Sequence, residues 1–396
     1  MTARYAHKRE AILETATEIV NAHGVKGLTI VRVAEAVKLS TTSITYYFKR
    51  KEELAAAVME RSLERRTEVV RRAGAEPTPK ARVRGLVTRS FEYIQKSIQG
   101  EVAPLAILAD IPVLQEPART ELTEKYVALS KAIRGYFETG AAAPPGLHRA
   151  RGHFVLGCVS WGRHWSRNYI PTDLPRLTDR LCALLESGLA TAPAETSLTL
   201  SVPETRNGNG DADYLAAATN LINERNYKGV SVKQIAERLN VTKGSFYYYH
   251  DGKDDLVAAC FDRTHEEIFA AQDAAMALDA NGWERLHACL AHLIDIQLFS
   301  DGPLLRPSAL DALPDEMRAR VVGQSNMALR RFAGMVSDGI CDGSIHRVDA
   351  LVAADAIEAL IYSAWDLRPW ASRLPAEQAS RYYLSTLAEG LFDDTV

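Results

Sequence analysis

Apolar residues recur along this chain at the spacing of amphipathic helices. Near the start they stand at i, i+1, i+4, i+7 and i+8, a spacing that places them on one helical face: Ile12, Leu13, Ala16, Ile19 and Val20. The same spacing returns 202 residues later: Tyr214, Leu215, Ala218, Leu221 and Ile222. Glycines follow both stripes, Gly24 and Gly27 in the first and Gly229 in the second, and they predict helix ends.

These two stripes belong to an internal duplication. With an offset of 202, the segment Tyr214–Leu256 aligns to the start of the chain without a gap and keeps Lys-Gly and Ala-Glu pairs in register. Thr29 and Ser231 are the candidate N-caps of a second helix in each copy. A tight turn then leads into a third helix, and a fourth follows from Lys51 or Lys253.

The third predicted helix has the composition of a DNA-reading element. It comprises Thr41–Tyr47 in one copy and Lys243–Tyr249 in the other, with short polar residues first and tyrosines last. Small polar side chains near a helix start can reach base edges in the major groove, while phenols and lysines suit the flanking phosphates. Two helices joined by a short turn therefore predict a helix-turn-helix in each half.

Both segments resemble the DNA-binding head of the TetR family of bacterial transcription regulators, over roughly residues 8–62 and 212–264. The resemblance implies an all-helical regulator, not an enzyme, with a C-terminal domain that binds an effector and dimerises. It also implies these DNA contacts: Thr41, Thr42, Ser43, Thr45, Tyr46, Tyr47 and Lys51 in the first head, and Lys243, Gly244, Ser245, Tyr247, Tyr248, Tyr249 and Lys253 in the second. Thr42 and Thr45 depart from the family's usual Gly and Tyr, so we expect the two heads to read different bases. His250 stands where the family usually has a buried Phe, as Phe48 does.

Charge differs between the two heads. Residues 1–72 carry 14 Lys and Arg against 9 Asp and Glu, a net charge of +5, whereas residues 206–269 carry 8 against 10, a net −2. Because non-specific DNA affinity comes from neutralised phosphates, we expect the first head to bind DNA more strongly. Arg4, Lys8 and Arg9 form either a basic arm for the minor groove or a frayed terminus.

After each head, the pattern predicts a body of amphipathic helices. The predicted helices are 83–98, 105–111, 118–139, 150–169 and 177–189 in the first body, and 283–299, 308–313, 316–337, 350–370 and 376–392 in the second. Trp161 matches Trp365, and Gly188 matches Gly390, which extends the duplication over the whole chain. The last two helices of each body are apolar, so we expect them to pair within one chain as a four-helix pseudo-dimer. The alternative is a homodimer of chains with four heads.

The chain thus divides into five predicted regions: a head (1–62), a body (63–190), a flexible linker rich in Pro, Thr, Ser, Gly and Asn (191–211), a second head (212–264) and a second body (265–396). A length of 396 residues with 47% apolar residues suits two globular units. Five scattered cysteines argue against a disulfide framework and fit a reducing cytosol. With no signal peptide and no apolar run of about 18 residues, we expect a cytoplasmic protein without membrane contact.

Candidate chemistry in the bodies points to ligand binding rather than catalysis. The motifs GxSxG, P-loop and HExxH are absent, so we expect no catalytic residues, no metal and no cofactor. Polar and aromatic residues of the bodies are candidates for an effector pocket: His153, His164, Trp165, Asn168, His292, Asp295, Tyr362 and Trp370. The matched Trp161 and Trp365 are interpreted as a structural cluster at the seam between the bodies.

These features predict a sequence-specific transcription regulator, a ligand-responsive repressor whose two unlike recognition helices read two half-sites. The expected partners are a double-stranded DNA operator and a small-molecule effector. Two alternatives stay open. One is a ligand- or protein-binding scaffold whose second head has lost DNA contact. The other is an all-helical enzyme, supported only by the set around His292 and Asp295.

Overall fold

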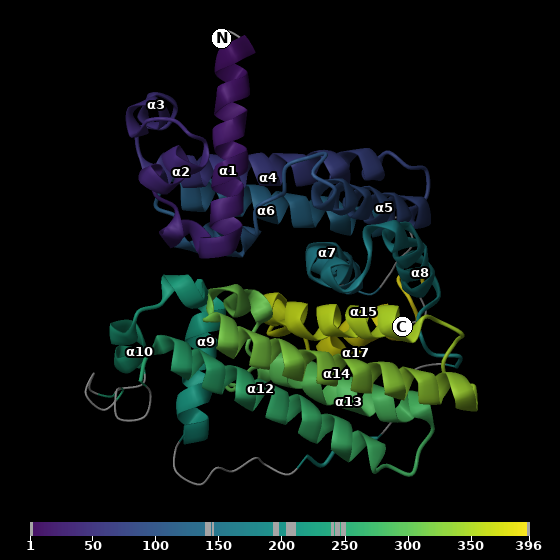
Figure 1. Ribbon diagram of the computed structural model, residues 1–396. Coiled ribbons are helices and arrows are strands. Elements are labelled where there is room, and N and C mark those ends of the chain that lie inside the picture. The colour runs from purple at the N-terminus through teal and green to yellow at the C-terminus, as the bar shows by residue number, and fades with distance from the viewer. Residues whose placement is uncertain are drawn as a thin grey trace.

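The computed structural model describes residues 3–138, 144, 146–192, 198–202, 211–238, 241, 246 and 251–393 (Figure 1). These residues are helical apart from turns and one bridge between Ala190 and Ile345, which confirms the predicted all-α class. The first unit contains α1 (Ala3–Gly27), α2 (Ile30–Ala36), α3 (Thr41–Tyr47), α4 (Lys51–Gly74), α5 (Pro79–Ile98), η1 (Leu108–Val113), α6 (Ala118–Arg134), η2 (Gly135–Phe137), α7 (Leu147–Trp165), η3 (Ser166–Asn168), η4 (Pro171–Asp173) and α8 (Leu174–Ser187). The second contains α9 (Asp211–Gly229), α10 (Val232–Arg238), α12 (Lys253–Met276), α13 (Gly282–Phe299), η5 (Pro307–Ala312), α14 (Asp315–Asp342), α15 (Ala350–Ser363), η6 (Ala364–Leu367), α16 (Arg368–Ala371) and α17 (Ala376–Ala388).

Capping side chains explain where several helices begin. Thr29 Oγ1 accepts a hydrogen bond from Arg32 N at 3.2 Å at the start of α2. Ser231 Oγ accepts one from Gln234 N at 3.3 Å at the start of α10, so both predicted N-caps are confirmed. Such hydroxyls satisfy backbone donors that have no partner within the helix.

The first helix of each head bends at a residue with a left-handed backbone. In α1 this residue is Gly24, with φ 64°, and in α9 it is Asn226, with φ 57°. The two positions match at the offset of 202. With ψ of 175° and 157°, both lie in a region that glycine adopts readily and that residues with a Cβ rarely adopt, so the backbone at Asn226 is strained. The helical geometry thus breaks at Gly24, where the sequence predicts a helix end, and α1 closes with a last turn at Gly27.

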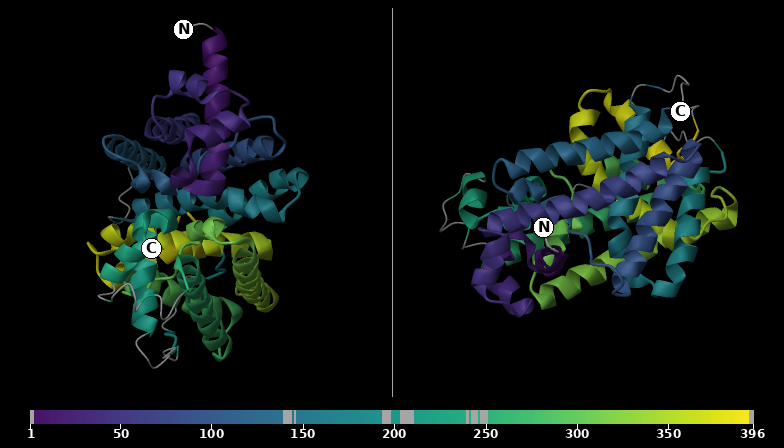
Figure 2. Two further views of the ribbon diagram at one scale, coloured as in Figure 1. Left: turned by 60° about the vertical axis from the view of Figure 1, so that its left-hand side comes forward. Right: turned by 90° about the horizontal axis from the view of Figure 1, so that it is seen from above.

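Both heads lie at the same end of the molecule, and the bodies extend away from them (Figures 1 and 2). Two helices of 24 residues each, α4 and α12, start in the heads and run on into the bodies. The apolar residues of the first head belong to one continuous core with both bodies. Those of the second head form a separate cluster with η5 and α14, which makes the second head the more independent of the two.

Helices α7 and α8 of the first body pack against α15 and α17 of the second. The chain segments that follow α8 and α17 cross here and exchange backbone hydrogen bonds. Leu189 N donates to Leu387 O at 3.0 Å, and Leu391 N donates to Leu185 O at 2.9 Å. Because each pair is the image of the other at the offset of 202, the contact is reciprocal.

Several predicted segments differ in the structure. The predicted helix 350–370 is divided into α15, η6 and α16, and the predicted helices 105–111 and 308–313 are the 3-10 turns η1 and η5. Arg4, Lys8 and Arg9, for which the sequence left a basic arm and a frayed terminus open, are helical within α1. Of the predicted linker, Thr191 donates to Gly343 O at 3.0 Å, and Leu200 and Val202 pack on the core. Residues 193–197 and 203–210 lie outside the described residues.

In the part of the chain that the structure describes, no helix combines the length and apolarity that crossing a membrane requires. All five cysteines are free thiols, four of them buried.

Candidate DNA-reading heads and ligand cavity

The first recognition helix, α3, is fixed by its apolar side and presents its polar side to solvent. Ile44 is fully buried, and Phe48 at the end of the helix is 4% exposed. Ser40 Oγ caps the helix by accepting from Ser43 N at 3.1 Å. The opposite face is exposed and consists of the predicted DNA contacts Thr41, Thr42, Thr45 and Tyr46, with Ser43 and Tyr47 partly exposed.

Tyrosines link α3 to the start of α1. Tyr46 is 74% exposed, and its ring meets that of Tyr47 at a centroid distance of 5.2 Å in an edge-on arrangement. Tyr5 of α1 packs on Tyr47 at 4.7 Å, and the guanidinium of Arg9 lies 5.2 Å from the ring centre of Phe48. The basic start of the chain is therefore packed beside the recognition helix.

Lys51 and Lys253 occupy matching positions but different surroundings. Lys51 begins α4 and is exposed. The Nζ atom of Lys253 donates to Tyr227 O at 2.9 Å and to Val230 O at 3.1 Å, and lies 3.7 Å from the centre of the Tyr227 ring. The second lysine thus binds the turn between α9 and α10.

The other predicted contacts of the second head lie outside the described residues: Lys243, Gly244, Ser245, Tyr247, Tyr248, Tyr249 and also His250. Within the described part, Phe246 is fully buried, as Ile44 is in the first head. Ile235 of α10 and Ala218 of α9 are also fully buried, so the helical framework of the second head has the apolar pattern predicted for it.

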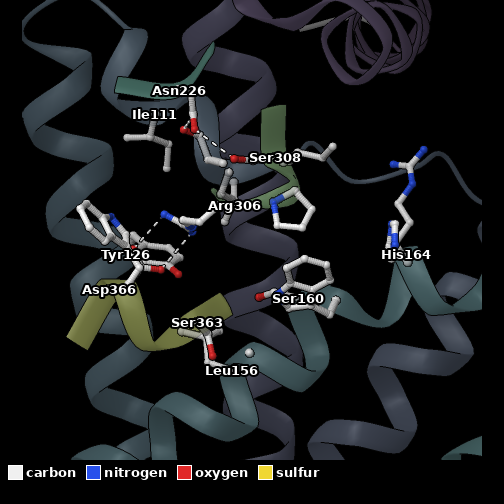
Figure 3. A pocket seen from close by; sticks show the side chains of 18 of the residues that line it. Ile111, Tyr126, Leu156, Ser160, His164, Asn226, Arg306, Ser308, Ser363 and Asp366 are labelled. Carbon is white, nitrogen blue, oxygen red and sulfur yellow. Dashed lines mark hydrogen bonds and ion pairs between the residues drawn. The ribbon is translucent and has the colours of Figure 1, made fainter. Parts of the chain in front are cut away.

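A cavity of about 500 Å³ lies where the first body meets the second unit (Figure 3). The first body contributes residues of α4, α6, α7 and the segment 105–112, and the second unit contributes α9, η5 and η6. Tyr126 and Ser160 of the first body line this space together with Arg306 and Asp366 of the second (Figure 3). The wall therefore combines parts of the chain that are more than 200 residues apart.

Polar groups in the wall are held by bonds within the second unit and by one bond between the two units. Arg306 pairs with Asp366 through two contacts, at 3.1 and 3.2 Å. His153 Nε2 lies 2.7 Å from Ser363 O, and burial lowers the pKa of this imidazole. Ser308 Oγ donates to Asn226 Oδ1 at 3.4 Å.

A second cavity of about 320 Å³ lies inside the first body and shares part of this wall. Arg66 of α4 lines both cavities, as does Arg163 of α7. Burial is the main cause that lowers the pKa of Arg66, and the nearby Arg163 adds to it. Burial also raises the pKa of Tyr126, next to Arg66, to about 12.

The segment 105–113 connects the larger cavity to both heads. In the first head, Asn21 Nδ2 donates to Leu105 O at 3.0 Å, and Val25 N donates to Asp110 Oδ2 at 3.1 Å. In the second head, the side-chain amide of Asn226 donates to Ala109 O. One stretch of backbone therefore both lines the cavity and is hydrogen-bonded to both heads.

Comparison with known proteins identifies the heads. The family model described as "Bacterial regulatory proteins, tetR family" matches the chain twice, at residues 12–58 and 215–260. The chain belongs to the TetR family. Each match falls on one of the two heads, so a single chain holds two TetR-type heads in tandem. The members of this family are regulatory proteins and not enzymes, which is the class expected from the sequence.

Similarity to individual proteins is limited in length or in identity. The TetC protein of transposon Tn10 from Escherichia coli is 33% identical over 75 residues, which make up 19% of this chain and 38% of TetC. The chain thus spans less than half the length of that relative. AibR, crystallised with isovaleryl coenzyme A and operator DNA, is 25% identical over 45% of this chain and 97% of its own, with a TM-score of 0.39. FadR from Bacillus subtilis, crystallised with stearoyl-CoA, is 20% identical over 45% and 97%, with a TM-score of 0.35.

Two of the effector residues expected in this TetR-family chain line the larger cavity, namely His153 and His164. Trp165 is instead buried beside Phe91, with ring centres 6.3 Å apart, and Asn168 is exposed at the end of η3. Trp370 is 5% exposed and lies outside the cavity wall.

The predicted residues of α13 lie away from the cavity. His292 Nε2 is 3.4 Å from Glu267 Oε1, and Asp295 accepts a hydrogen bond from Ser380. Both bonds stay within the second body. Among the described residues, no three His, Cys, Asp or Glu side chains gather as metal ligands would.

The matched tryptophans lie at the seam as expected, but they form cavity wall rather than a filled core. Trp161 and Trp365 both line the larger cavity and are partly exposed. Tyr362 is outside the wall and supports it, since its ring stacks on Trp161 at 5.6 Å. The guanidinium of Arg368 lies 4.5 Å from the ring centre of Trp365.

Sequence reasoning missed other polar residues of the wall, among them Arg66, Tyr126, Asn226 and Arg306, whereas Asp366 belonged to the polar and aromatic set considered for a pocket. A partial signal existed for Asn226, because it matches Gly24 at the offset of 202 and so stands at the predicted end of a helix. Arg66 lies within a basic run of α4, and the sequence does not distinguish the buried arginine of this run from the exposed ones. The others meet only through tertiary packing.

Proposed function

We propose that this TetR-family chain is a sequence-specific DNA-binding regulator, a repressor that a small ligand controls. The observation that carries the proposal is the first recognition helix. Ile44 and Phe48 anchor α3, so that its hydroxyls and Tyr46 form an exposed polar face. A rigid helix with short polar side chains matches what direct reading of major-groove base edges requires.

The two heads are proposed to read different half-sites. The first offers Thr41, Thr42 and Thr45 to the groove, where the sequence of the second has Lys243, Gly244 and Tyr247. Base recognition depends on the donors and acceptors presented, so unlike helices favour an operator that is not palindromic. A homodimer of identical heads would favour a palindromic operator.

The two bodies are proposed to pair as an intrachain pseudo-dimer. The reciprocal bonds of Leu189 to Leu387 and of Leu391 to Leu185 support this, because isologous contacts of this kind relate two copies by a two-fold axis. One chain then presents both heads, and we expect a particle of 43.6 kDa in solution. Light scattering at micromolar concentration tests this, and a stable species of twice that mass would contradict it.

Ligand control is proposed to act through the segment 105–113. A ligand in the larger cavity would press on this segment, which is hydrogen-bonded to Asn21 of the first head and to Asn226 of the second. A shift of the segment would change the position of both recognition helices together. The ligand would then favour one of two arrangements of the heads, as population shift requires.

Footprinting with a salt titration tests DNA binding. We expect protection of two adjacent major grooves and a steep loss of affinity with rising salt, because phosphate contacts release counterions. Thr45→Ala should weaken protection of one half-site only, since Thr45 is exposed and supports no core contact. The matched control is Thr67→Ala, another exposed threonine, which lies on α4. No protected site, or no dependence on salt, would refute the proposal.

A second candidate follows from Lys253. Because its ammonium binds two carbonyls of its own head and that head has a net charge of −2, the second head could serve as a scaffold without DNA contact. Lys243→Ala with Tyr249→Ala separates the candidates. An unchanged footprint over both grooves would favour the scaffold, and loss of one half-site would favour two DNA-reading heads.

A further inference from the structure

Arg66 is a cation placed between two cavities without an anion beside it. Its side chain lines both the 500 Å³ cavity at the seam and the 320 Å³ cavity within the first body. The Nε atom is buried and has no hydrogen-bond partner. Arg66 forms neither a hydrogen bond nor an ion pair with any residue that the structure describes.

The groups around Arg66 do not compensate its positive charge. After burial and the phenol of Tyr126, the next influence on the pKa of Arg66 is Arg163, which is positive and lines the same two cavities. The remaining influences are the phenols of Tyr126 and Tyr93, which stay neutral near pH 7 because burial raises the pKa of both. A buried charge without a counter-ion is unfavourable, and an acidic ligand would remove that penalty.

The second body lacks both arginines. At the offset of 202, the position of Arg66 is taken by Ile268, which is 2% exposed and part of the apolar core. The position of Arg163 follows from the match of Trp161 with Trp365 and is taken by Leu367, which is 1% exposed. The duplication has therefore produced one body with a cationic cavity and one with aliphatic side chains at the same places.

We propose that the two cavities that share Arg66 bind an organic acid, with its acidic group on Arg66 and beside Arg163, and that each chain binds one such molecule. This proposal rests on the proposed ligand control of the regulator and names the class of ligand. The apolar part of the acid lies along Leu105, Leu129 and Leu156, which line both cavities. An acid of this kind satisfies the guanidinium and buries its own apolar surface in the same step.

The acid site adjoins the segment that reaches the heads. Arg163 Nη1 donates to Leu105 O at 3.2 Å, and the same carbonyl accepts from Asn21 of the first head at 3.0 Å. An acidic group next to Arg163 competes with this carbonyl for the guanidinium. Binding of the acid therefore acts on a carbonyl group that is itself hydrogen-bonded to α1.

Two dyes with the same aromatic scaffold test the proposal on the full chain, in the absence of DNA. The dye 1-anilinonaphthalene-8-sulfonate carries an acidic group, whereas N-phenyl-1-naphthylamine does not, and both fluoresce in apolar cavities. We expect the wild-type chain to bind the sulfonate roughly ten-fold more tightly than the neutral dye, since a charged hydrogen bond is worth about that factor or more. Native mass spectrometry should show one sulfonate per chain.

Arg66→Met should weaken sulfonate binding roughly ten-fold and leave binding of the neutral dye within about two-fold. The control is Arg72→Met, an exposed arginine of the same helix, which should change neither. Equal affinities of the two dyes for the wild type, an unchanged sulfonate affinity in Arg66→Met, or two sulfonates per chain would each overturn the proposal. If Arg66→Met does not fold, the relative affinities of the two dyes for the wild-type chain and the number of sulfonates bound per chain still test the proposal. The dye measurements contain no DNA, so they test acid binding separately from DNA binding. A failed footprint would refute the proposed function without refuting acid binding, and failed dye binding would refute acid binding without refuting DNA binding.

Discussion

Gly188 stands at the crossing of the two bodies, and replacing it by alanine tests how closely they pack. Its backbone has φ 70° and ψ −169°, a region that side chains other than that of glycine rarely allow. A Cβ at this position would lie 2.5 Å from Gly390 N and 2.6 Å from the carbonyl carbon of Glu389, with Ala388 O closer still. All three are backbone atoms, so they cannot rotate away as a side chain would.

The expected loss of stability combines two terms. The backbone conformation alone costs about 1–3 kcal/mol for a residue with a Cβ. Relieving the overlap separates the crossing segments and weakens bonds such as Leu189 N to Leu387 O, now 3.0 Å, at about 0.5–1.5 kcal/mol each. We therefore expect Gly188→Ala to lower the free energy of unfolding by about 3–4 kcal/mol.

Gly100→Ala is the matched control. Gly100 also has a positive φ, 76°, but an added Cβ would have no atom within 4 Å. This variant should lose only the conformational term, about 1 kcal/mol. Urea unfolding of both variants, followed by circular dichroism and tryptophan fluorescence together, measures the difference. If Gly188→Ala loses no more stability than Gly100→Ala, the bodies do not pack as described, and the proposed pseudo-dimer loses its main support.

Three further predictions concern charge, pH and the recognition helix. Lys51→Ala should reduce the slope of log affinity against log salt by about 1, whereas Lys253→Ala should leave the slope unchanged and lower the melting temperature, because Lys253 binds carbonyls of its own head. Burial raises the pKa of Asp355 to about 7 and that of Glu358 to about 8, so the folded chain holds protons that the unfolded chain releases. Stability measured by urea unfolding should thus fall as pH rises from about 5 to 8, and replacing the two residues by Asn and Gln should flatten that fall; a rise with pH would contradict this. Ile44→Ala should destabilise the first head by roughly 2–4 kcal/mol, measured as earlier loss of its hydrogen-exchange protection, since the side chain is fully buried; unchanged protection would refute the anchoring of α3.

Features that depend on neighbours in the chain were predictable from the sequence. The caps at Thr29 and Ser231 act on backbone groups three residues away, so local composition is enough to place them. Helix α3 and most body helices follow from apolar periodicity for the same reason. The duplication also matches Gly188 with Gly390, and the structure brings these two glycines close together.

Other elements depended on distant partners. The predicted helix 350–370 is divided at η6, where Asp366 turns to meet Arg306. The basic start of the chain is helical against α3, with Tyr5 on Tyr47 and Arg9 on Phe48. Periodicity reports which face of a helix is buried but not what buries it, so neither outcome could be read from the chain alone.

The sequence by itself determined that the chain is helical, that it is duplicated, and that each half begins with a TetR-type head. Only the tertiary structure decided where a ligand would bind. His153 and His164 were recognisable as polar residues on apolar helices, but Arg66, Asn226 and Asp366 became one cavity wall only when the two units packed together. The reason is physical: local bonds are encoded over a few residues, whereas a cavity is the space left where surfaces from distant parts of the chain fail to meet.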